Sequence, residues 1–543
     1  MSGPSQPAAL DHGHAVPAMP APLTSWLVPG ATCWRQERAA RVAILHDGAA
    51  YFAASREAIL KARSSVMLIG WSFDPRVRLT PQGEADRETM ADLLRRLKAT
   101  RPEVEIHLLI WDMPWPISAG TDLKPDDIRA LLGPGIEYVV DSRLPFGACQ
   151  HQKVLVVDDR IAFSGGSDFE VNRWDTPAHR DRDPLRRLPT GEDYPPRHDV
   201  MMLVDGAAAS ALSDLARQRW QEATSGRLAS AVSGPVGTDA RGPSRPDSSL
   251  SDSSLPDPWP DSVTPLFEDV TVGLARTIPA RETGEAIREN EALYLLAIRR
   301  ASRHIYLENQ YFTSPLIAEA LAARLAEPEG PDIVVVLAKR SPNGFDRITM
   351  DGARRGLIAR LRAADRYGRL RILAPHTLQG RPILVHSKVA IFDDRMLRVG
   401  STNLNNRSMG YDTECDLALE TLDGDAGDAR RIAIARVRNG LIAHHAGCPR
   451  DAFEEAVREK GLLAAIDDPA LVPARRLCSL VASRRGPVVR LVEAFHLGDP
   501  VGLVDAWRPW RRHRALARRR EGANAVAGQQ PVRAGAAQPA EAS

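Results

Sequence analysis

One short pattern of residue types occurs twice in this chain and constrains its fold more than anything else in the sequence. Each copy reads His, one residue, Lys, four residues, Asp, six residues, Gly. The members are His151, Lys153, Asp158 and Gly165 in the first copy and His386, Lys388, Asp393 and Gly400 in the second. The copies lie 235 residues apart, from position 151 to position 386, and the spacing agrees at every member. Matched spacing of this kind predicts an internal duplication.

The residues between Lys and Asp are apolar in both copies, at 154–157 and at 389–392. Such runs predict short buried strands. Side chains two positions apart on a strand point the same way, so each His is expected to share a face with its Lys. The glycine that follows permits a close approach of the backbone to a neighbouring group.

Two such halves that face each other supply one nucleophile, one acid and two cations. This set suits an anionic phosphodiester, because paired ammonium groups stabilise the charge that develops on phosphoryl oxygens. We therefore expect a reaction that needs no metal and no cofactor. A single His-x-Lys is more often a chance feature of a surface, and the repetition is what favours catalysis.

The chain has 543 residues, which is more than one hydrophobic core usually holds. Strands and helices alternate in both parts and predict an α/β fold. Phe73 and Phe312 lie 239 residues apart, close to the offset of the histidines, so the two parts run almost in register. We predict a disordered N-terminal lead (1–39), a first domain (40–224), a Ser/Pro/Asp-rich linker or loop (225–265), a second domain (266–470) and a basic, largely flexible C-terminal extension (471–543).

Composition excludes several classes of protein. Charged residues make up 26% of the chain and nearly balance to +2, which argues against a general polyanion binder. The five cysteines are scattered without a C-x-x-C pair, so neither a disulfide framework nor a structural zinc site of cysteines is expected. Cys149 and Cys415 are interpreted as small core residues, and His12 and His14 as part of a flexible tail. No signal peptide and no membrane span are predicted.

The two copies resemble the paired HKD motifs of the phospholipase D superfamily, over roughly residues 40 to 445. Further stretches are similar to its glycerophospholipid branch, namely 165–168 (GGSD), 173–176 (RWDT), 198–200 (HDV), 306–312 (YLENQYF), 400–403 (GSTN) and 406–408 (NRS). The resemblance implies two tandem phospholipase-D-like domains. Each would be a mixed β-sheet flanked by helices, and pseudo-two-fold symmetry would place the active site between them.

The resemblance also implies a two-step reaction through a covalent phosphohistidine. By similarity with the family, His151 is the nucleophile and His386 the general acid and base, although spacing alone leaves this order open. Lys153 and Lys388 would hold the phosphoryl oxygens. The polar residues after the glycines, Ser167, Ser401 and Asn403, are candidate phosphate ligands. Asp168, at the position that corresponds to Asn403, would repel a phosphate and is assigned a structural role.

A nucleophilic imidazole presents one nitrogen while a partner, usually a carboxylate, holds the other. In the family a carboxylate near Glu414 orients the motif histidine, so we assign Glu414 to His386. Asp199, at the start of the matching strand, is the corresponding hypothesis for His151. The motif residues Asp158 and Asp393 are interpreted as loop anchors rather than proton carriers.

The expected function is that of a phospholipase D, which hydrolyses glycerophospholipids to phosphatidate with possible transfer to alcohols. Three alternatives stay open, namely a cardiolipin-synthase-like transferase, an HKD nuclease and a non-catalytic membrane-binding scaffold. The expected partners are a phospholipid surface and water or an alcohol, and no nucleic acid is expected. The protein is expected to be a monomer that is cytoplasmic and peripheral at the membrane, unless it is exported by a non-classical route. Aromatic residues (Trp71, Phe73, Trp111, Trp115, Trp174, Tyr311 and Phe312) would in part wall a lipid groove. A basic run over 507–514 and 518–520 is a candidate membrane anchor.

Overall fold

The computed structural model describes residues 25–81, 88–113, 122–226, 228, 256–281, 285–422, 425–473, 475–480, 495, 498–506 and 508–528. One mixed β-sheet runs through the whole molecule, with the strand order β18-β13-β12-β11-β15-β16-β17-β9-β1-β8-β6-β5-β2-β3-β4. The short strand β10 pairs with β9 beside this path. The predicted α/β class is confirmed, but the two expected sheets are joined into one.

The first half is built from β1 to β8 and α1 to α4. Its strands are β1 (Arg35–His46), β2 (Ser65–Gly70), β3 (Glu105–Trp111), β4 (Glu137–Asp141), β5 (Val154–Val157), β6 (Ile161–Gly165), β7 (Arg197–His198) and β8 (Val200–Asp205). Its helices are α1 (Asp47–Lys61), α2 (Met90–Thr100), α3 (Pro125–Leu132) and α4 (Gly206–Thr224).

The second half repeats this order. Its strands are β9 (Phe267–Ile278), β10 (Ile287–Arg288), β11 (His304–Asn309), β12 (Asp332–Leu337), β13 (Leu370–Pro375), β14 (Leu384–Val385), β15 (Val389–Phe392), β16 (Met396–Gly400), β17 (Glu414–Glu420) and β18 (Leu477–Ser479). Its helices are α5 (Glu289–Arg300), α6 (Pro315–Ala326), α7 (Gly344–Ala364), α8 (Asp425–Ala446), α9 (Arg450–Lys460) and α10 (Leu462–Asp467). Beyond them lie α12 (Leu503–Ala506), the 3-10 turn η3 (Pro509–Arg511) and α13 (Arg512–Gly528).

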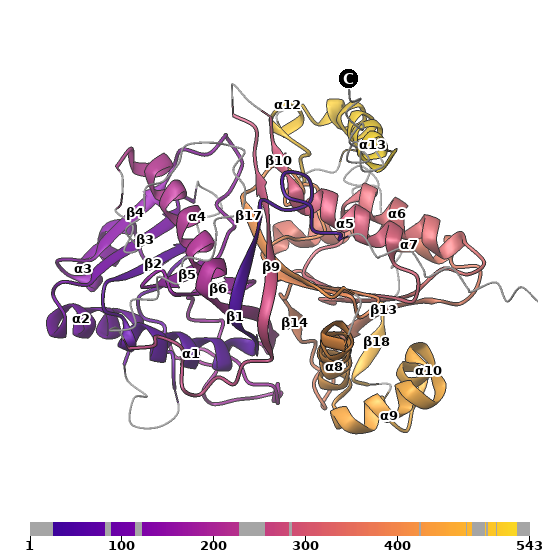
Figure 1. Cartoon of the computed structure of the whole chain (residues 1–543), viewed down its shortest axis with the longest axis horizontal. Helices are drawn as coiled ribbons and strands as arrows, with labels where there is room; N and C mark the ends of the chain where they lie inside the picture. Colours follow the sequence, from indigo (N-terminus) through magenta and orange to yellow (C-terminus); the bar gives the residue numbers. More distant parts are fainter. Residues whose placement is uncertain are drawn as a thin grey trace, which may run out of the picture.

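The halves meet where β1 pairs antiparallel with β9, with Arg35 opposite Leu274 and Val42 opposite Phe267. Outward from this junction both halves have the same strand order, β1-β8-β6-β5-β2-β3-β4 and β9-β17-β16-β15-β11-β12-β13. In both, the outer three strands are parallel and the inner ones antiparallel. Figure 1 shows β1 and β9 side by side in the middle of the molecule, with one half on each side. The predicted pseudo-two-fold relation therefore passes between β1 and β9.

Alternating side chains divide the apolar core between the two faces of the sheet. Along β2, Leu68 packs with α1 and α2, whereas Met67 and Ile69 belong to the cluster under α4. The cluster on the α4 face also holds residues of β15, β17 and α8, so it runs through both halves. On the other face each half has a core of its own, beneath α1 to α3 and beneath α5 and α6.

Hairpin turns of equal geometry follow the motif strands. Asp158 and Asp159 have φ of 55° and 56°, and Asp393 and Asp394 have φ of 54° and 53°. Aspartate is one of the few residues that tolerate this left-handed backbone, because its short side chain bonds locally. These turns return β6 along β5 and β16 along β15.

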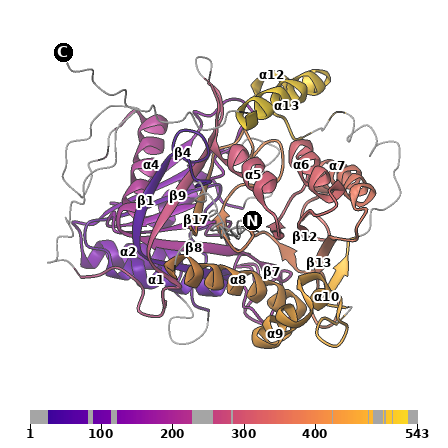
Figure 2. The ribbon, with the colours of Figure 1, turned by 45° about the vertical axis from the view of Figure 1, so that its right-hand side comes forward.

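Two of the predicted domain boundaries are wrong. Residues 1–39 do not all form a disordered lead, because β1 begins at Arg35 and Trp26 and Leu27 are buried. Residues 471–543 are not largely flexible within the part that is described, because β18 pairs with β13 and α13 is a helix. Figure 2 shows α12 and α13 above α5 and α6. Most of the predicted linker (225–265) lies outside the described residues, but Trp259 near its end is buried.

Candidate active site

Each motif lies at the start of a strand of its own half, and the two motifs are tied together across the halves by backbone contacts. Each His-x-Lys segment directly precedes its strand, β5 or β15. The backbone of β7 pairs with that of β14, with Arg197 opposite Leu384, and the His386 N–H donates to the carbonyl of His198 at 2.8 Å. The N–H of His151 likewise donates to the carbonyl of Thr413 at 3.2 Å. Each motif is thus positioned by a segment of the opposite half.

The carboxylates that hold the two histidines are exchanged between the halves. Nδ1 of His151 lies 2.9 Å from Oε2 of Glu414, and Nδ1 of His386 lies 2.9 Å from Oδ2 of Asp199. The predicted carboxylates are therefore those that contact the histidines, but the predicted pairing is wrong. The physical reason is the pairing of β7 with β14, which places Asp199 beside the second motif.

Burial sets the charge state of these pairs. It is the largest cause that lowers the pKa of both histidines well below their ordinary value, and the nearby Lys388 and Lys153 lower it further. Burial also raises the pKa of Glu414 and of Asp199. A neutral imidazole that donates Nδ1–H to its carboxylate leaves the lone pair on Nε2. Each histidine is thus held in the tautomer that a nucleophile or a general base requires.

The motif lysines have different partners in the two halves. Nζ of Lys153 lies 3.2 Å from a carboxylate oxygen of Asp168, whereas Nζ of Lys388 donates to the amide oxygen of Gln310 at 3.2 Å. Each also donates to the carbonyl of its own motif histidine. Burial lowers the pKa of Lys388 to about 7, Asp199 counteracts this, and the positive charge of Lys153 adds to it. A phosphate that binds here would therefore meet two unequal cations.

Asp168 has the structural role that the sequence indicated. Its Oδ1 accepts the Trp71 N–H at 2.8 Å and its Oδ2 faces Lys153. The corresponding Asn403 is buried, and its side-chain oxygen has no hydrogen-bond partner among the described residues. Only the second half thus offers an uncommitted polar atom at this position.

The two candidate serine ligands are also unequal. Ser401 donates its hydroxyl to Oε2 of Glu414 at 2.5 Å, so the predicted phosphate contact through that proton is wrong. Its proton instead fixes the carboxylate that holds His151. Ser167 is buried, and its hydroxyl lies 3.4 Å from the carbonyl of Asp168.

The motif aspartates bind backbone rather than imidazole. Oδ1 and Oδ2 of Asp158 accept N–H groups of Arg63, Ser64 and Ser65 at 2.7 to 3.0 Å. Asp393 does the same for residues 302–304 of the second half. Each carboxylate therefore anchors the start of the strand next to the motif, β2 or β11.

The glycines that follow the motif strands leave room for the carboxylate groups of neighbouring residues. A Cβ on Gly166 would overlap the Asp199 carboxylate and lie 3.0 Å from the His386 carbonyl, and one on Gly400 would overlap Asp416. The neighbour of Gly166 is partly the backbone of the opposite motif, whereas the neighbour of Gly400 belongs to the same half, so glycine is needed at both positions because protein atoms approach closely.

Comparison with known proteins agrees with this geometry. Residues 139–316 match the family described as Phospholipase D, and residues 294–424 match the Cardiolipin synthase, PLD-like domain. The chain belongs to the phospholipase D superfamily. Each match includes one of the two motifs.

Curated phospholipases D align with most of the chain at low identity. Phospholipase D A of Dictyostelium discoideum is 28% identical over 431 residues, which cover 68% of this chain and 32% of that protein. Phospholipase D gamma 3 of Arabidopsis thaliana is 23% identical over 536 residues, which cover 74% of this chain and 61% of that protein. The chain thus spans less than two thirds of the length of these relatives.

The phospholipase D fold is also found among solved structures. Phosphatidylserine synthase of Haemophilus influenzae Rd KW20 superposes with a TM-score of 0.51 at 13% identity, covering 75% of this chain and 88% of that chain. Among the described helices, none is both long enough and apolar enough to cross a bilayer.

One cation of this phospholipase D site was not singled out from the sequence. Arg197 is buried, its charge lowers the pKa of His386, and its Nε has no hydrogen-bond partner among the described residues. Its own pKa is lowered to about 9, mainly by burial and then by Arg173. The signal in the sequence is its place directly before His198 and Asp199.

Of the aromatic residues named in the sequence analysis, some lie in the core and others lie beside the site. Four are buried in the core, namely Phe73, Trp111, Trp174 and Phe312, and Trp115 lies outside the described residues. Trp71 and Tyr311 are partly exposed and follow the corresponding strands β2 and β11. Trp71 adjoins Asp168 and Tyr311 adjoins Gln310, so both lie beside the partners of the motif lysines.

Proposed function

We propose that this protein is a phospholipase D that hydrolyses glycerophospholipids to phosphatidate through a covalent phosphohistidine. One observation carries the proposal. Two imidazoles, that of His386 buried and that of His151 slightly exposed, are each held at Nδ1 by a carboxylate of the opposite half and share a site with Lys153, Lys388 and Arg197. This is the set of groups that a two-step displacement at phosphorus requires.

In the first step Nε2 of His151 attacks phosphorus and the bond from phosphorus to the headgroup oxygen breaks. His386, protonated on Nε2, gives that proton to the departing oxygen, so the headgroup leaves as a neutral alcohol. The products are a phosphatidyl group on His151 and an unprotonated His386. Glu414 stabilises the positive charge that the imidazole of His151 acquires.

In the second step His386 removes a proton from water, and the resulting oxygen attacks phosphorus. The bond from phosphorus to His151 breaks, which releases phosphatidate and restores both histidines. An alcohol in place of water gives a phosphatidyl ester by the same sequence of bonds, and this is the route for transphosphatidylation.

The negative charge of the bound substrate explains how His386 can begin the reaction protonated. In the free site burial, and then the charges of Arg197 and Lys388, lower the pKa of His386. A bound phosphodiester adds a negative charge among these groups and raises that pKa again. Substrate binding thus favours the protonated form of His386 that the first step requires.

Several features favour a lipid as the substrate. The curated relatives are phospholipases D. Trp71 and Tyr311 are partly exposed beside the lysine partners and are proposed to contact the glycerol or acyl portion. Arg511, Arg514 and Arg518 line one surface hollow, and the neighbouring Trp510 is 66% exposed. We propose that this face docks on an anionic membrane as a monomer at the bilayer surface.

A phosphatidyltransferase is the second candidate, because residues 294–424 match the Cardiolipin synthase, PLD-like domain. It differs from hydrolysis only in the acceptor of the second step.

The test uses the full-length chain with mixed phospholipid vesicles, in buffer alone, with ethanol, and with phosphatidylglycerol as an acceptor. Phosphatidate in buffer and phosphatidylethanol with ethanol are expected, whereas cardiolipin as the main product would favour the transferase. His386→Asn should accumulate lipid phosphorus on His151 when the substrate has an acidic leaving group that needs no protonation. His151→Asn should accumulate none. Full turnover by either variant would reject the mechanism.

A further inference from the structure

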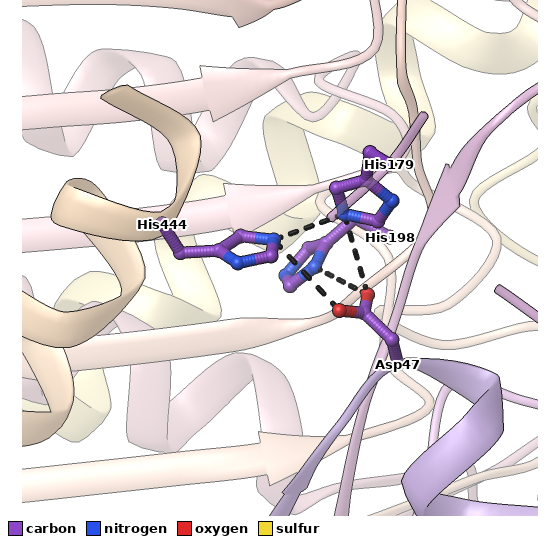
Figure 3. A group of neighbouring side chains, drawn as sticks. All are labelled: Asp47, His179, His198 and His444. Atoms are coloured by element: carbon purple, nitrogen blue, oxygen red, sulfur yellow. Dashed lines mark hydrogen bonds and ion pairs between the residues drawn. The ribbon is translucent and has the colours of Figure 1, made fainter. Parts of the chain in front are cut away.

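Three histidines and one aspartate of this chain meet in a cluster next to the active site. We define the histidine cluster as Asp47, His179, His198 and His444, whose candidate ligand atoms all lie within 4.8 Å of one another. Asp47 begins α1, His179 lies in the loop before β7, His198 lies in β7 and His444 near the end of α8 (Figure 3). Three members come from the first half and one from the second. Neither catalytic step uses any of these side chains.

The facing atoms are spaced like the ligands of one small cation. Nε2 of His179 lies 2.9 Å from Nε2 of His444, and Nδ1 of His198 lies 2.8 Å from Oδ1 of Asp47. The carboxylate of Asp47 lies 3.6 Å from Nε2 of His179 and 3.8 Å from Nε2 of His444. Ligand bonds of about 2.0 to 2.1 Å in a tetrahedron put neighbouring ligand atoms roughly 3.3 Å apart. The observed separations bracket this value.

The outer nitrogens of two of these histidines are held as metal ligands usually are. Nδ1 of His179 contacts Asp175 at 2.9 Å, and Nε2 of His198 contacts Glu308 at 3.1 Å. A carboxylate on the outer nitrogen fixes the tautomer in which the inner nitrogen has the lone pair. Asp175 is itself paired with the buried Arg186, and Glu308 accepts from Ser387 at 2.6 Å. Without an ion Nδ1 of His198 donates to Asp47. With its proton lost, the inner nitrogens of His179 and His198 and the Asp47 carboxylate would all face the centre as acceptors.

Hydrogen bonds among the four members do not satisfy all of their inward-facing polar atoms. If His179 donates Nδ1–H to Asp175, its Nε2 is an acceptor that faces a second imidazole nitrogen. Oδ2 of Asp47 is buried and has no hydrogen-bond partner among the described residues. Burying an unpaired carboxylate oxygen is costly, and one cation at the centre would satisfy all four members. Asp47 and His179 also have positive φ, 66° and 39°, which few residues adopt without a compensating contact.

We propose that the histidine cluster binds one zinc ion and that this ion joins the two halves of the protein. Three imidazole nitrogens and one carboxylate oxygen suit zinc, and four protein ligands leave no position open for a substrate. The site is structural and separate from the reaction, which the paired histidines and lysines perform.

The position of the site gives it a defined consequence. His198 lies next to Asp199, the carboxylate on His386, and the carbonyl of His198 accepts the N–H of His386. Glu308, on the outer side of His198, also accepts from Ser387 of the second motif. An ion on His198 therefore fixes the segment that positions the second catalytic histidine.

Metal content tests this proposal without any measurement of catalysis. Full-length protein without an affinity tag is dialysed against zinc and then against metal-free buffer, and zinc is determined per chain. One equivalent is expected, and His179→Gln should bind zinc about 10²-fold or more weakly. The matched control is His107→Gln, a buried first-half histidine outside the cluster, which should keep the full equivalent. A chain with both His12→Ala and His14→Ala should keep it too, since those residues lie outside the cluster.

A second variant keeps the test decisive if His179→Gln fails to fold. His444→Cys retains four ligands and replaces one nitrogen by a thiolate. Loaded with cobalt, the unaltered protein should give the visible bands of a tetrahedral site, and His444→Cys should add a thiolate-to-cobalt charge-transfer band. Zinc content in the unaltered protein no higher than in a folded His179→Gln would overturn the proposal and leave a protonated hydrogen-bond network. Cobalt bound by folded His444→Cys without the new band would overturn it as well.

Discussion

At the scale of single residues, the exchange of carboxylates is what organises the catalytic centre. His151 depends on Glu414 and His386 on Asp199, at 2.9 Å in both pairs. Motif spacing identified the two histidines. The resemblance to the family, together with an acidic residue at the start of each matching strand, pointed to the two carboxylates. The sequence could not assign the partners, because the contact between β7 and β14 joins residues almost two hundred positions apart.

Asp199→Asn should remove the downfield Nδ1–H resonance of His386 in proton NMR spectra, and Glu414→Gln should remove that of His151. Each change should also lower kcat by about 10²-fold or more, because the imidazole loses the partner that fixes its tautomer. Asp214→Asn, at an exposed ion pair with Arg35, is the control and should alter neither. Loss of the His151 resonance in Asp199→Asn would contradict the exchanged pairing.

The pKa of Lys388, lowered to about 7, predicts an alkaline limit to activity. Raising the pH through this value removes a proton and hence a positive charge that the phosphoryl oxygens need. For a soluble short-chain phospholipid, kcat/KM should therefore fall above a midpoint near 7. The corresponding fall in kcat should occur at higher pH, because the bound phosphate favours the protonated ammonium group of Lys388. A kcat/KM that stays level from about pH 6 to 9 would be inconsistent with this role.

At the scale of elements, patterns of buried residues were predictable and the central strands were not. The mostly apolar runs at 66–69, 106–111, 154–157 and 200–204 predict strands, and they lie within β2, β3, β5 and β8. Their residues are almost all buried, which gives a dense apolar run. In β1 and β9 exposed polar residues such as Arg38 and Glu268 interrupt the apolar residues, so neither strand was recognised. The pattern over 452–465 predicts one helix, but Gly461, with φ of 86°, separates α9 from α10.

The exposed arginines around α13 predict a measurable membrane affinity. Replacing Arg511, Arg514 and Arg518 by Gln should weaken binding to vesicles rich in anionic lipid by about 10²-fold, at about 1 kcal/mol for each arginine near the surface. The measurement is sedimentation with vesicles at low and high salt.

A matched triple variant removes the same charge elsewhere, at the exposed residues Arg95, Arg96 and Arg129 of α2 and α3. It should bind as the unaltered protein does. Equal weakening by both triple variants would mean that net charge, and not this face, drives the association.

At the scale of the whole molecule, the continuous sheet and the core shared across it make the halves mechanically dependent. The cluster on the α4 face includes residues of both halves, and β1 is paired on both sides, with β8 and with β9. The repeated motif predicted the duplication. It could not predict that the copies share one sheet, because that depends on the unrecognised strands.

We expect both halves to unfold in one transition. Leu93→Ala, in the core beneath α2, should cost about 2 to 5 kcal/mol of the free energy of unfolding. Hydrogen exchange followed in denaturant should show β3 and β12 losing protection at one midpoint, lowered equally by this variant. Leu321→Ala, in the separate core of the second half, is the reciprocal change. A midpoint that shifts in β3 alone would show that the halves unfold independently.

The exchanged carboxylates also bear on how such a chain could arise. If a single copy of this unit once acted as a homodimer, each subunit would have lent its acid to the other, and one codon would have specified both acids. Fusion into one gene released that constraint. The two positions are now Asp199 and Glu414, beside a pair of lysines whose partners also differ. Under that history, a division of roles between the two histidines would have become heritable only once the two copies no longer shared a sequence.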